Sequence, residues 1–269
     1  MSFVNYNGKI LASSAPILSG LSMGFRTGMG LIETMLLRDG VIRFIAQHMA
    51  RLYNSARKLG FKFLVEKEQL MLELYKTIDH SQHPENGIVR IQIFPNCSDD
   101  QISFIINCVP LDLPVYVNGN NALTVGVATK VLKCFDSVAY LKTSSRQPYI
   151  VAKNEALENN WDDALLINQY GRIVEATIAN VFIVQGSHVL TPPLTEGCIE
   201  GIMRNEILLM NTSSTWKVLQ KEISIEDLMN ADEVFLTNAV RGIQPVVNFK
   251  DRNYKIDVSL QIEAAINQY

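Results

Sequence analysis

The sequence predicts a mixed α and β fold (α+β) in two domains, and three observations lead to this prediction. Two hairpin signals, Asn7-Gly8 and Asp39-Gly40, each lie between short apolar runs near the N-terminus. Apolar residues recur with helical spacing through residues 45–59. The second half of the chain is a series of strand-like runs separated by glycine turns. We therefore expect hairpins and helices in front and a strand-rich region behind.

The best linker candidate is a stretch with two prolines followed by a cluster of Asn and Gly, "PLDLPVYVNGNNAL". It divides the chain into a smaller N-terminal α/β domain, residues 1–112, and a larger C-terminal domain, residues 122–269. Residues 113–121 are the predicted linker.

The expected elements of the N-terminal domain follow from these patterns. Strands flank each hairpin turn, a helix ends at Gly60, a second helix follows, and a strand pair closes the domain. Their ranges are 3–12 and 30–45 for the hairpins, 45–59 and 66–78 for the helices, and 87–96 and 101–111 for the strand pair.

The C-terminal domain is expected to alternate strands with four helices. Ser224 with Asp227 three residues on is a capping signal for the shortest helix. The strands are expected at 123–132, within 162–193 and at 233–247, and the helices at 145–159, 201–210, 224–231 and 258–267.

Composition excludes several classes of function. The net charge is −3 and the basic residues are scattered, which argues against nucleic-acid binding. No apolar window is long enough for a membrane span, and the N-terminus does not resemble a signal peptide. The four cysteines form no CxxC pair, so buried reduced thiols in a cytoplasmic protein are expected, with no metal site.

Three charged residues stand out, and each has a plain structural alternative. Lys142 lies just ahead of an expected helix and could be a surface lysine. Glu175 lies in an apolar strand run and could be a solvent-facing acid on an edge strand. Arg51 lies on an expected helix and could simply extend its head group to water.

Six stretches, taken in order, resemble the class IV aminotransferases, the fold-type-IV pyridoxal-phosphate (PLP) enzymes. This family includes branched-chain and D-amino acid aminotransferases and 4-amino-4-deoxychorismate lyases. The stretches cover most of the chain: "GFRTGMGLIETM", "HMARLYNSARKLG", "LKTSSRQPYIVAKNEA", "DDALLINQYGRIVEATIANVFIV", "LTPPLTEGCIEGIMRNEIL" and "EVFLTNAVRGIQPV".

The resemblance implies a role for each matching residue. Lys142 matches the lysine that forms an imine, the internal aldimine, with PLP, whereas Lys153 matches a basic position without a catalytic role. Glu175 matches the acid at the pyridine nitrogen, and Arg51 matches the arginine at the phosphate. The remaining phosphate contacts implied by the match are the helix start at Ile202 and Met203 and the turn at Asn238 and Ala239.

These roles are chemically coherent. A lysine amine can bond the cofactor and afterwards act as a base. An electron sink needs a protonated ring nitrogen, and a carboxylate stabilises that proton. The ring cation in turn offsets the free-energy cost of burying the acid. An arginine and helix-end amides suit a phosphate dianion.

The substrate contacts are less well defined by the sequence. Thr27 and Met29 stand where many members have a tyrosine and an acid, and Phe94-Pro95-Asn96 replaces a common Arg-Gly pair. Met203 and Asn238–Ala239 resemble the lyase branch, because transaminases more often have a threonine in each of those stretches. The candidates for binding a substrate carboxylate are Arg26, Arg90, Arg146 and Arg241.

Three hypotheses for the function follow. The first is a PLP-dependent transaminase acting on an amino acid and a 2-keto acid, and the second is 4-amino-4-deoxychorismate lyase, which releases pyruvate and 4-aminobenzoate. The third is a non-catalytic homologue, which retention of Lys142, Glu175 and Arg51 together argues against. The resemblance also implies a homodimer, whereas the composition and the lack of a long apolar window predict no nucleic-acid or membrane partner.

Overall fold

The computed structural model describes residues 2–83, 85–97, 102–111, 122–210 and 216–267. The described residues of 1–113 and 141–145 form one compact unit, and those of 114–140 and 146–269 form another. The linker expected at 113–121 lies outside the described residues. The sequence division counted Lys142 with the C-terminal domain, whereas the backbone of residues 141–145 packs with the first unit.

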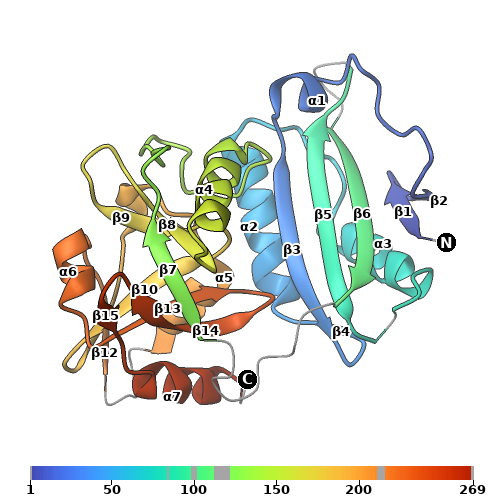
Figure 1. Ribbon diagram of the computed structural model, residues 1–269. Coiled ribbons are helices and arrows are strands. Elements are labelled where there is room, and N and C mark those ends of the chain that lie inside the picture. Colours follow the sequence, from blue (N-terminus) through green and yellow to red (C-terminus); the bar gives the residue numbers. More distant parts are fainter. Residues whose placement is uncertain (1, 84, 98–101, 112–121, 211–215, 268–269) are drawn as a thin grey trace. The chain divides into compact units, whose positions relative to one another are not determined.

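The first unit is built on an antiparallel sheet whose described strands run in the order β2-β1-β6-β5-β3-β4 (Figure 1). Both predicted hairpins form, with positive φ at Asn7 and Asp39 in the turns. The strands are β1 (Phe3–Tyr6), β2 (Lys9–Ala12), β3 (Leu31–Arg38), β4 (Val41–Ile42), β5 (Gly87–Pro95) and β6 (Ile102–Pro110).

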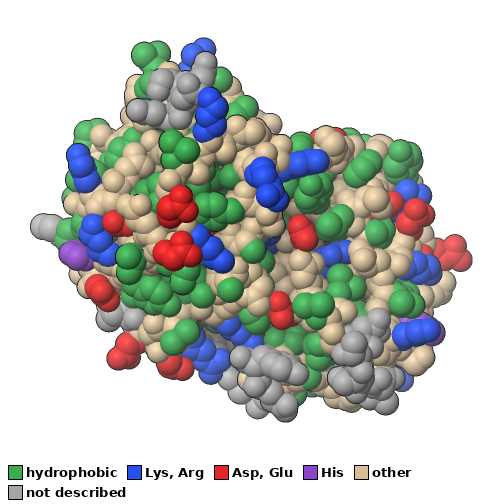
Figure 2. Space-filling view, turned by 180° about the vertical axis from the view of Figure 1, so that it is seen from behind, with side chains coloured by type: hydrophobic (Ala, Val, Ile, Leu, Met, Phe, Trp, Pro, Cys, Tyr) green, Lys and Arg blue, Asp and Glu red, His purple; other side chains and the backbone are tan. Residues whose placement is uncertain are grey.

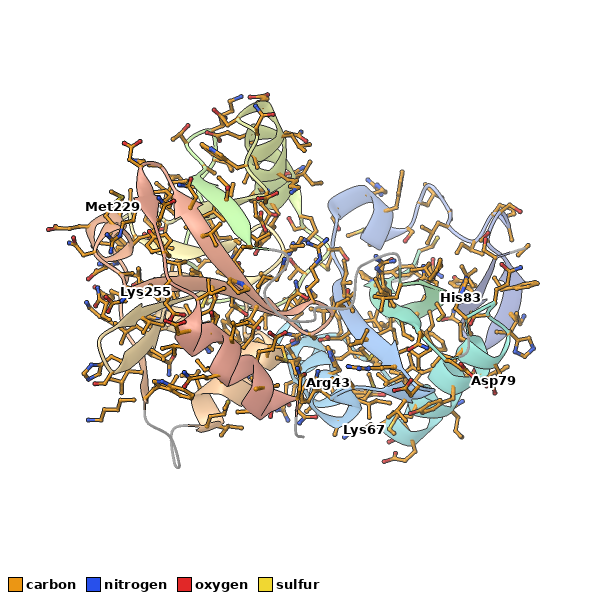
Figure 3. The ribbon with its side chains drawn as sticks, turned by 60° about the horizontal axis from the view of Figure 1, so that its bottom comes forward. Arg43, Lys67, Asp79, His83, Met229 and Lys255 are labelled. Atoms are coloured by element: carbon orange, nitrogen blue, oxygen red, sulfur yellow. The ribbon has the colours of Figure 1, made fainter. Side chains whose placement is uncertain are left out.

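Three helices accompany this sheet: α1 (Met23–Thr27), α2 (Ile45–Lys58) and α3 (Lys67–Asp79). Helix α2 packs against β3, and α3 packs against β1 and β6. Lys67 and Asp79, which begin and end α3, and His83, which follows it, are labelled in Figure 3. The helix α1 was not expected from the sequence, because five residues are too few to show a helical period.

The second unit contains a mixed sheet with the order β12-β11-β10-β13-β14-β7-β8-β9, and β15 pairs with β14. Its described strands are β7 (Leu123–Val127), β8 (Asp163–Ile167), β9 (Ile173–Ala176), β10 (Asn180–Gln185), β11 (His188–Thr191), β12 (Lys217–Gln220), β13 (Glu233–Asn238), β14 (Gly242–Phe249) and β15 (Arg252–Asn253). Strand β7 ends at Val127, five residues earlier than expected, and the chain continues as a loop.

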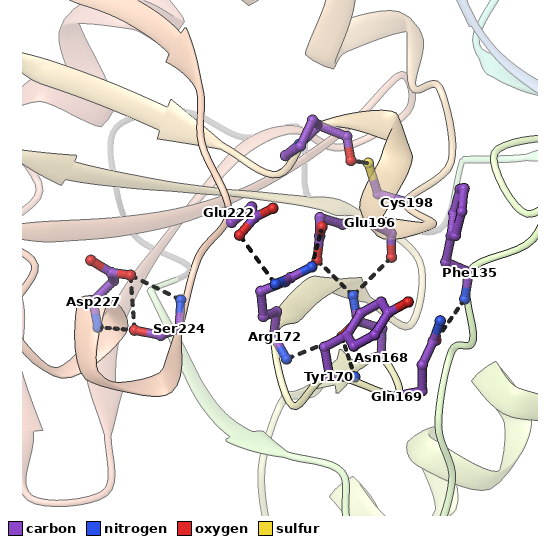
Figure 4. Close-up of polar contacts among 11 residues, drawn as sticks. Phe135, Asn168, Gln169, Tyr170, Arg172, Glu196, Cys198, Glu222, Ser224 and Asp227 are labelled. Carbon is purple, nitrogen blue, oxygen red and sulfur yellow. Dashed lines mark hydrogen bonds and ion pairs between the residues drawn. The ribbon is translucent and has the colours of Figure 1, made fainter.

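The helices of the second unit are α4 (Gln147–Glu158), the 3-10 turn η1 (Leu194–Glu196), α5 (Ile202–Leu209), α6 (Ile225–Met229) and α7 (Asp257–Ile266). Helix α4 lies against β8, and its Tyr149, Ala152 and Ala156 pack on Ala164 and Leu166. Ser224 and Asp227 form the predicted capping box at α6 (Figure 4). The end of α6 is marked by Met229 in Figure 3.

Surface charge and cysteine exposure can be compared with the expectations drawn from the composition. On the face in Figure 2, basic and acidic side chains are interspersed. Cys108 and Cys198 are buried as expected, but Cys97 and Cys134 are exposed. No helix among the described residues is long and apolar enough to cross a membrane, and these residues contain no cluster of three metal-binding side chains.

Candidate active site

The backbone around Lys142 is tied to strand β3 of the first unit. Ile32 N donates to Lys142 O at 3.0 Å, and Ser144 N donates to Gly30 O at 2.9 Å. Glycine at position 30 gives room for this approach, because a Cβ there would lie 2.6 Å from Ser144 Oγ and 3.0 Å from the backbone oxygen of Ile93. Lys142 is half-buried, in a loop that β3 holds in place.

A buried carboxylate on β3 meets two side chains of α2. Strand alternation turns Glu33 toward the helix, together with Leu31 and Met35. Arg51 donates from Nε and Nη2 to the two Glu33 oxygens at 2.7 and 2.6 Å, and His48 Nδ1 lies 2.7 Å from Oε2. The Arg51 side chain is 9% exposed, so the alternative of an arginine reaching out to water is excluded.

The charges of this group are fixed by burial and by each other. Burial raises the pKa of Glu33, but the charge and hydrogen bonds of Arg51, with those of His48, outweigh it and hold that pKa at about 2. Burial lowers the pKa of His48, although its bond to Glu33 acts in the opposite direction. The nearby charges of Arg51 and Lys142 lower it further. Glu33 is therefore ionised and His48 is neutral at pH 7.

Glu175, on β9 of the second unit, is a fully buried acid with different partners. It is 2% exposed, which excludes a solvent-facing position. Tyr149 Oη donates to Oε1 at 2.7 Å, Ile199 N donates to Oε2 at 2.9 Å, and Asn180 Nδ2 lies 3.4 Å from Oε2. In the described part of this unit, the groups that hydrogen-bond to Glu175 are all neutral.

The electrostatics of Glu175 follow from that environment. Burial raises its pKa, and the charges of Lys133 and Arg146 together with the hydrogen bonds from Tyr149 and Ile199 offset the effect only in part. Burial, and then the adjacent Glu175, raise the pKa of Tyr149, so Tyr149 remains a hydrogen-bond donor. A cation placed against Glu175 would relieve the cost of its burial.

The start of helix α5 lies beside the same segment. Gly201 is its N-cap, and no side chain caps the helix. A Cβ at position 201 would lie 1.9 Å from Asn180 Oδ1, while Asn180 Nδ2 donates to Ile199 O at 2.8 Å. The first amides of a helix have no intrahelical partner, so those of Ile202 and Met203 are suited to an anion.

The segment leading to α5 is anchored by another buried acid, Glu196, at the end of η1 (Figure 4). Arg172 donates to its two oxygens at 2.6 and 2.9 Å, and Asn168 Nδ2 donates to Oε2 at 2.7 Å. This anchor helps to fix residues 196–201, and therefore the Ile199 amide that bonds Glu175.

The turn between β13 and β14 lies close to the end of β9. Asn238 Oδ1 accepts from Val240 N at 3.0 Å and Arg241 N at 2.7 Å, and Asn238 Nδ2 donates to Ile178 O at 3.3 Å. Just before the turn, Thr237 Oγ1 is buried and has no hydrogen-bond partner within the described chain. An unpaired buried hydroxyl beside a turn is suited to a ligand oxygen.

The structure therefore places the predicted residues in two groups. Arg51 and Lys142 belong to the first unit, whereas Glu175, Ile202, Met203, Asn238 and Ala239 belong to the second. Within the second unit, Asn180 contacts the segment before α5 and Asn238 contacts Ile178. Of the substrate candidates, Arg26 on α1 is exposed and Arg90 on β5 is half-buried, both in the first unit. Arg146 and Arg241 line one pocket of the second unit.

Sequence reasoning missed Glu33, His48 and Tyr149. Alternation along residues 31–37 could have shown that Glu33 faces the same side as Leu31 and Met35. The helical spacing of Tyr149, Ala152 and Ala156 could have placed Tyr149 on the buried face of α4. The contacts themselves depend on how distant segments pack, which no local pattern contains.

Comparison with known proteins identifies the class to which this fold and these residues belong. The family model described as amino-transferase class IV matches residues 30–249, and the chain is a member of that family. The family's enzymes depend on pyridoxal phosphate.

Curated relatives of similar length include both kinds of enzyme. The chain is 25% identical to a putative branched-chain-amino-acid aminotransferase of Methanocaldococcus jannaschii, over 91% of this chain and 87% of that protein. It is likewise 25% identical to the aminodeoxychorismate lyase of Bacillus subtilis, over 92% of this chain and 87% of that protein.

Solved structures show the same fold. Branched-chain amino acid aminotransferase from Escherichia coli superposes with a TM-score of 0.88 at 20% identity, covering 99% of this chain and 93% of that one. The 4-amino-4-deoxychorismate lyase from Pseudomonas aeruginosa superposes with a TM-score of 0.86 at 21% identity, covering 98% of each chain.

Proposed function

We propose that this chain is an aminotransferase that moves an amino group between an amino acid and a 2-keto acid, with Lys142 as the lysine that bonds pyridoxal phosphate. The observation that carries the proposal is Glu175, which is buried, has a raised pKa and hydrogen-bonds only to neutral groups among the described residues. A protonated pyridine nitrogen is the kind of cation that such a carboxylate binds.

Each predicted residue has a defined task in this proposal. Bound pyridoxal phosphate supplies an electron sink for the negative charge that develops at Cα of the substrate. Glu175 holds the proton at the ring nitrogen. Arg51 and the first amides of α5 bind the phosphate, with Thr237 and the 238–239 turn beside it. The Lys142 amine takes the proton from Cα and returns it at C4′.

Glu33 contributes by fixing Arg51. The two parallel hydrogen bonds hold the plane of the guanidinium against α2, so Arg51 does not have to be ordered when a phosphate arrives. Arg51 is thereby positioned before the cofactor binds.

Covalent labelling tests the proposal directly. The purified protein is loaded with pyridoxal phosphate, reduced with borohydride and digested, and the cofactor-derived mass is expected on the peptide that contains Lys142. Lys142→Ala should lose the label and about 10²–10⁴-fold in amino transfer. Lys130→Ala, which changes an exposed lysine of the second unit, is the control and should keep the label on Lys142. Label on any other lysine contradicts the proposal.

Aminodeoxychorismate lyase is the second candidate. It is favoured by the buried Met203 at the start of α5 and by the Asn238 side chain that closes the turn, in the two stretches where transaminases more often carry a threonine. Release of pyruvate from aminodeoxychorismate without an added keto acid would establish this reaction. Consumption of a keto acid with a labelled amino donor would establish amino transfer.

Two further expectations belong to the same proposal. The protein is expected to form a homodimer, which light scattering on the eluting peak would measure. A cytoplasmic location is expected because all four cysteines are free, and fractionation of cells producing the protein would test it.

A further inference from the structure

Lys133 is a buried cation of the second unit to which the proposed function gives no task. It lies in the loop that follows β7 and is 9% exposed. Its Nζ donates to Ala139 O at 2.8 Å, and it forms no ion pair with any described residue. Lysine is rarely buried unless its charge is compensated, so a buried charge of opposite sign is expected nearby.

The loop holds the Lys133 side chain inside the unit. Lys133 N donates to Ile167 O at 2.9 Å, at the end of β8. Phe135 N donates to Gln169 Oε1 at 2.9 Å (Figure 4). Together with the bond from Nζ to Ala139 O, these contacts fasten the loop on both sides of the lysine. The ammonium is therefore fixed in position and cannot turn out to water without breaking them.

Tyr149 contacts both Lys133 and the buried acid Glu175. Lys133 Nζ lies 5.9 Å from the centre of the Tyr149 ring, and Tyr149 Oη donates to Glu175 Oε1 at 2.7 Å. All three residues belong to the second unit. Two buried charges of opposite sign thus approach the same aromatic ring without touching each other. Their attraction is stronger across a dry interior than it would be across water.

The other ionisable groups around Glu175 have contacts of their own. Arg146 is engaged by a backbone carbonyl and by the Tyr149 ring, and the buried Arg204 by a backbone carbonyl and a glutamine side chain. Cys198 stays protonated, because burial raises the pKa of its thiol to about 12.

Lys133 has the largest effect among the groups that oppose the burial of Glu175. Burial raises the pKa of Glu175, and the charge of Lys133 lowers it more than the Tyr149 hydrogen bond or the charge of Arg146 does. This order agrees with the geometry, in which Lys133 is a buried ammonium on the far side of the Tyr149 ring contact.

We propose that Lys133 is a positioning residue for Glu175, and that its buried charge keeps this carboxylate ionised before a cationic ligand binds. The inference rests on the proposed function, in which that ligand is the ring nitrogen. An ionised Glu175 accepts a nitrogen that already carries its proton, whereas a neutral Glu175 would have to supply the proton itself. Lys133 thereby determines which partner brings the proton.

The ionisation of Glu175 in the cofactor-free protein tests this inference. The side-chain carboxyl carbons of glutamate are labelled with ¹³C, and the signal that disappears in Glu175→Gln is followed by NMR against pH. Lys133→Met should raise the midpoint of this titration by about one pH unit or more, which is the size expected when a nearby opposite charge is lost. An unchanged midpoint would overturn the inference.

Three further variants separate the charge of Lys133 from its structural contacts. Lys133→Arg keeps the charge and should leave the midpoint close to the wild-type value. Lys133→Gln keeps a donor for Ala139 O without the charge and should raise the midpoint as Lys133→Met does. Lys130→Met, which changes an exposed lysine three residues earlier, should leave it unchanged. Equal shifts in Lys133→Arg and Lys133→Gln would show a structural role only and overturn the inference.

A stability measurement keeps the inference testable if Lys133→Met folds poorly. At pH 8 this substitution leaves an ionised Glu175 without its compensating charge, so adding Glu175→Gln should restore part of the lost stability. The urea midpoint should therefore rise more when Glu175→Gln is added to Lys133→Met than when it is added to the wild type. Equal rises in the two backgrounds would mean that the two charges are not coupled.

These measurements use no cofactor, so their failure can be told apart from failure of the proposed function. Labelled Lys142 with an unshifted Glu175 midpoint would keep the proposed function and reject the role of Lys133. A shifted midpoint without labelling of Lys142 would retain the action of Lys133 on Glu175 and reject the assignment of that acid to a ring nitrogen.

Discussion

Glu33 and Glu175 are both 1–2% exposed, but their partners differ in charge. Glu33, in the first unit, has a bidentate arginine and a pKa of about 2. Glu175, in the second unit, has a tyrosine hydroxyl, an amide and a raised pKa. The second unit can compensate a buried acid, since Arg172 does so for Glu196. Among the described residues Glu175 has no ion pair, and this observation supports its proposed role beside a cationic ring nitrogen.

Neutralising each acid should have opposite effects on stability, and the larger effect is expected at Glu33. Glu33→Gln leaves Arg51 buried without its counter-charge, which should lower the free energy of unfolding by about 3–5 kcal/mol at pH 7. Urea unfolding monitored by circular dichroism measures this value. A loss below about 1 kcal/mol would show that the pair does not behave as a buried ion pair.

Acid pH should act on Glu33 in a defined window. Because its pKa is lowered from 4.5 to about 2, its contribution is present above pH 4.5 and is lost as the pH falls to about 2. The difference in unfolding free energy between the wild type and Glu33→Gln should shrink by about 3 kcal/mol across that window. A difference that does not change with pH would mean that the folded and unfolded states bind the Glu33 proton with equal affinity.

Glu175→Gln should stabilise the protein when no cofactor is present. Its folded-state pKa is raised, so the wild type loses stability as the pH rises above 4.5, and the amide variant avoids that loss. We expect Tm at pH 8 to rise by about 2–4 °C, which is about 1 kcal/mol for a chain of this size. With saturating pyridoxal phosphate, the wild type should have the higher Tm and Glu175→Gln the lower. Thermal scans with and without cofactor make the comparison, and a lower Tm for the variant in both would contradict it.

Tyr149→Phe should have the smallest effect of the set. It removes one hydrogen bond to Glu175 and keeps the ring in the α4 core, so we expect a change of about 1 kcal/mol in unfolding free energy. The loss should grow with pH, because the bond matters most when Glu175 is ionised. Urea unfolding at pH 5 and pH 8 measures both values, and a loss that is the same at the two pH values would argue against this bond.

Local sequence signals were enough for much of the fold. The Asn7-Gly8 and Asp39-Gly40 turns, the helix α2 and the Ser224 capping box all form as predicted, because each depends on neighbouring residues. The short helix α1 and the pairing of β12 with β11 were not predicted. Neither has a local signature, because α1 is a single turn and the register of a parallel strand is set by distant residues.

The site shows the same division between local and distant information. Family motifs pointed to Lys142, Glu175 and Arg51 as candidates, but the sequence around Glu175 does not show whether its side chain is buried or exposed. Val174, Glu175 and Ala176 are all buried, so strand alternation carries no information there. Glu33 was missed because its partners lie 15 and 18 residues further on, and only the packing of α2 against β3 brings them together.

The protonation state of the bound ring nitrogen tests the role of Glu175 most directly. The protein is loaded with pyridoxal phosphate labelled with ¹⁵N in the ring, and the nitrogen shift is recorded between pH 6 and pH 9. We predict a protonated nitrogen throughout this range in the wild type and an unprotonated one at pH 8 in Glu175→Gln. A nitrogen that is unprotonated in the wild type, or equally protonated in the variant, would contradict the assignment of Glu175.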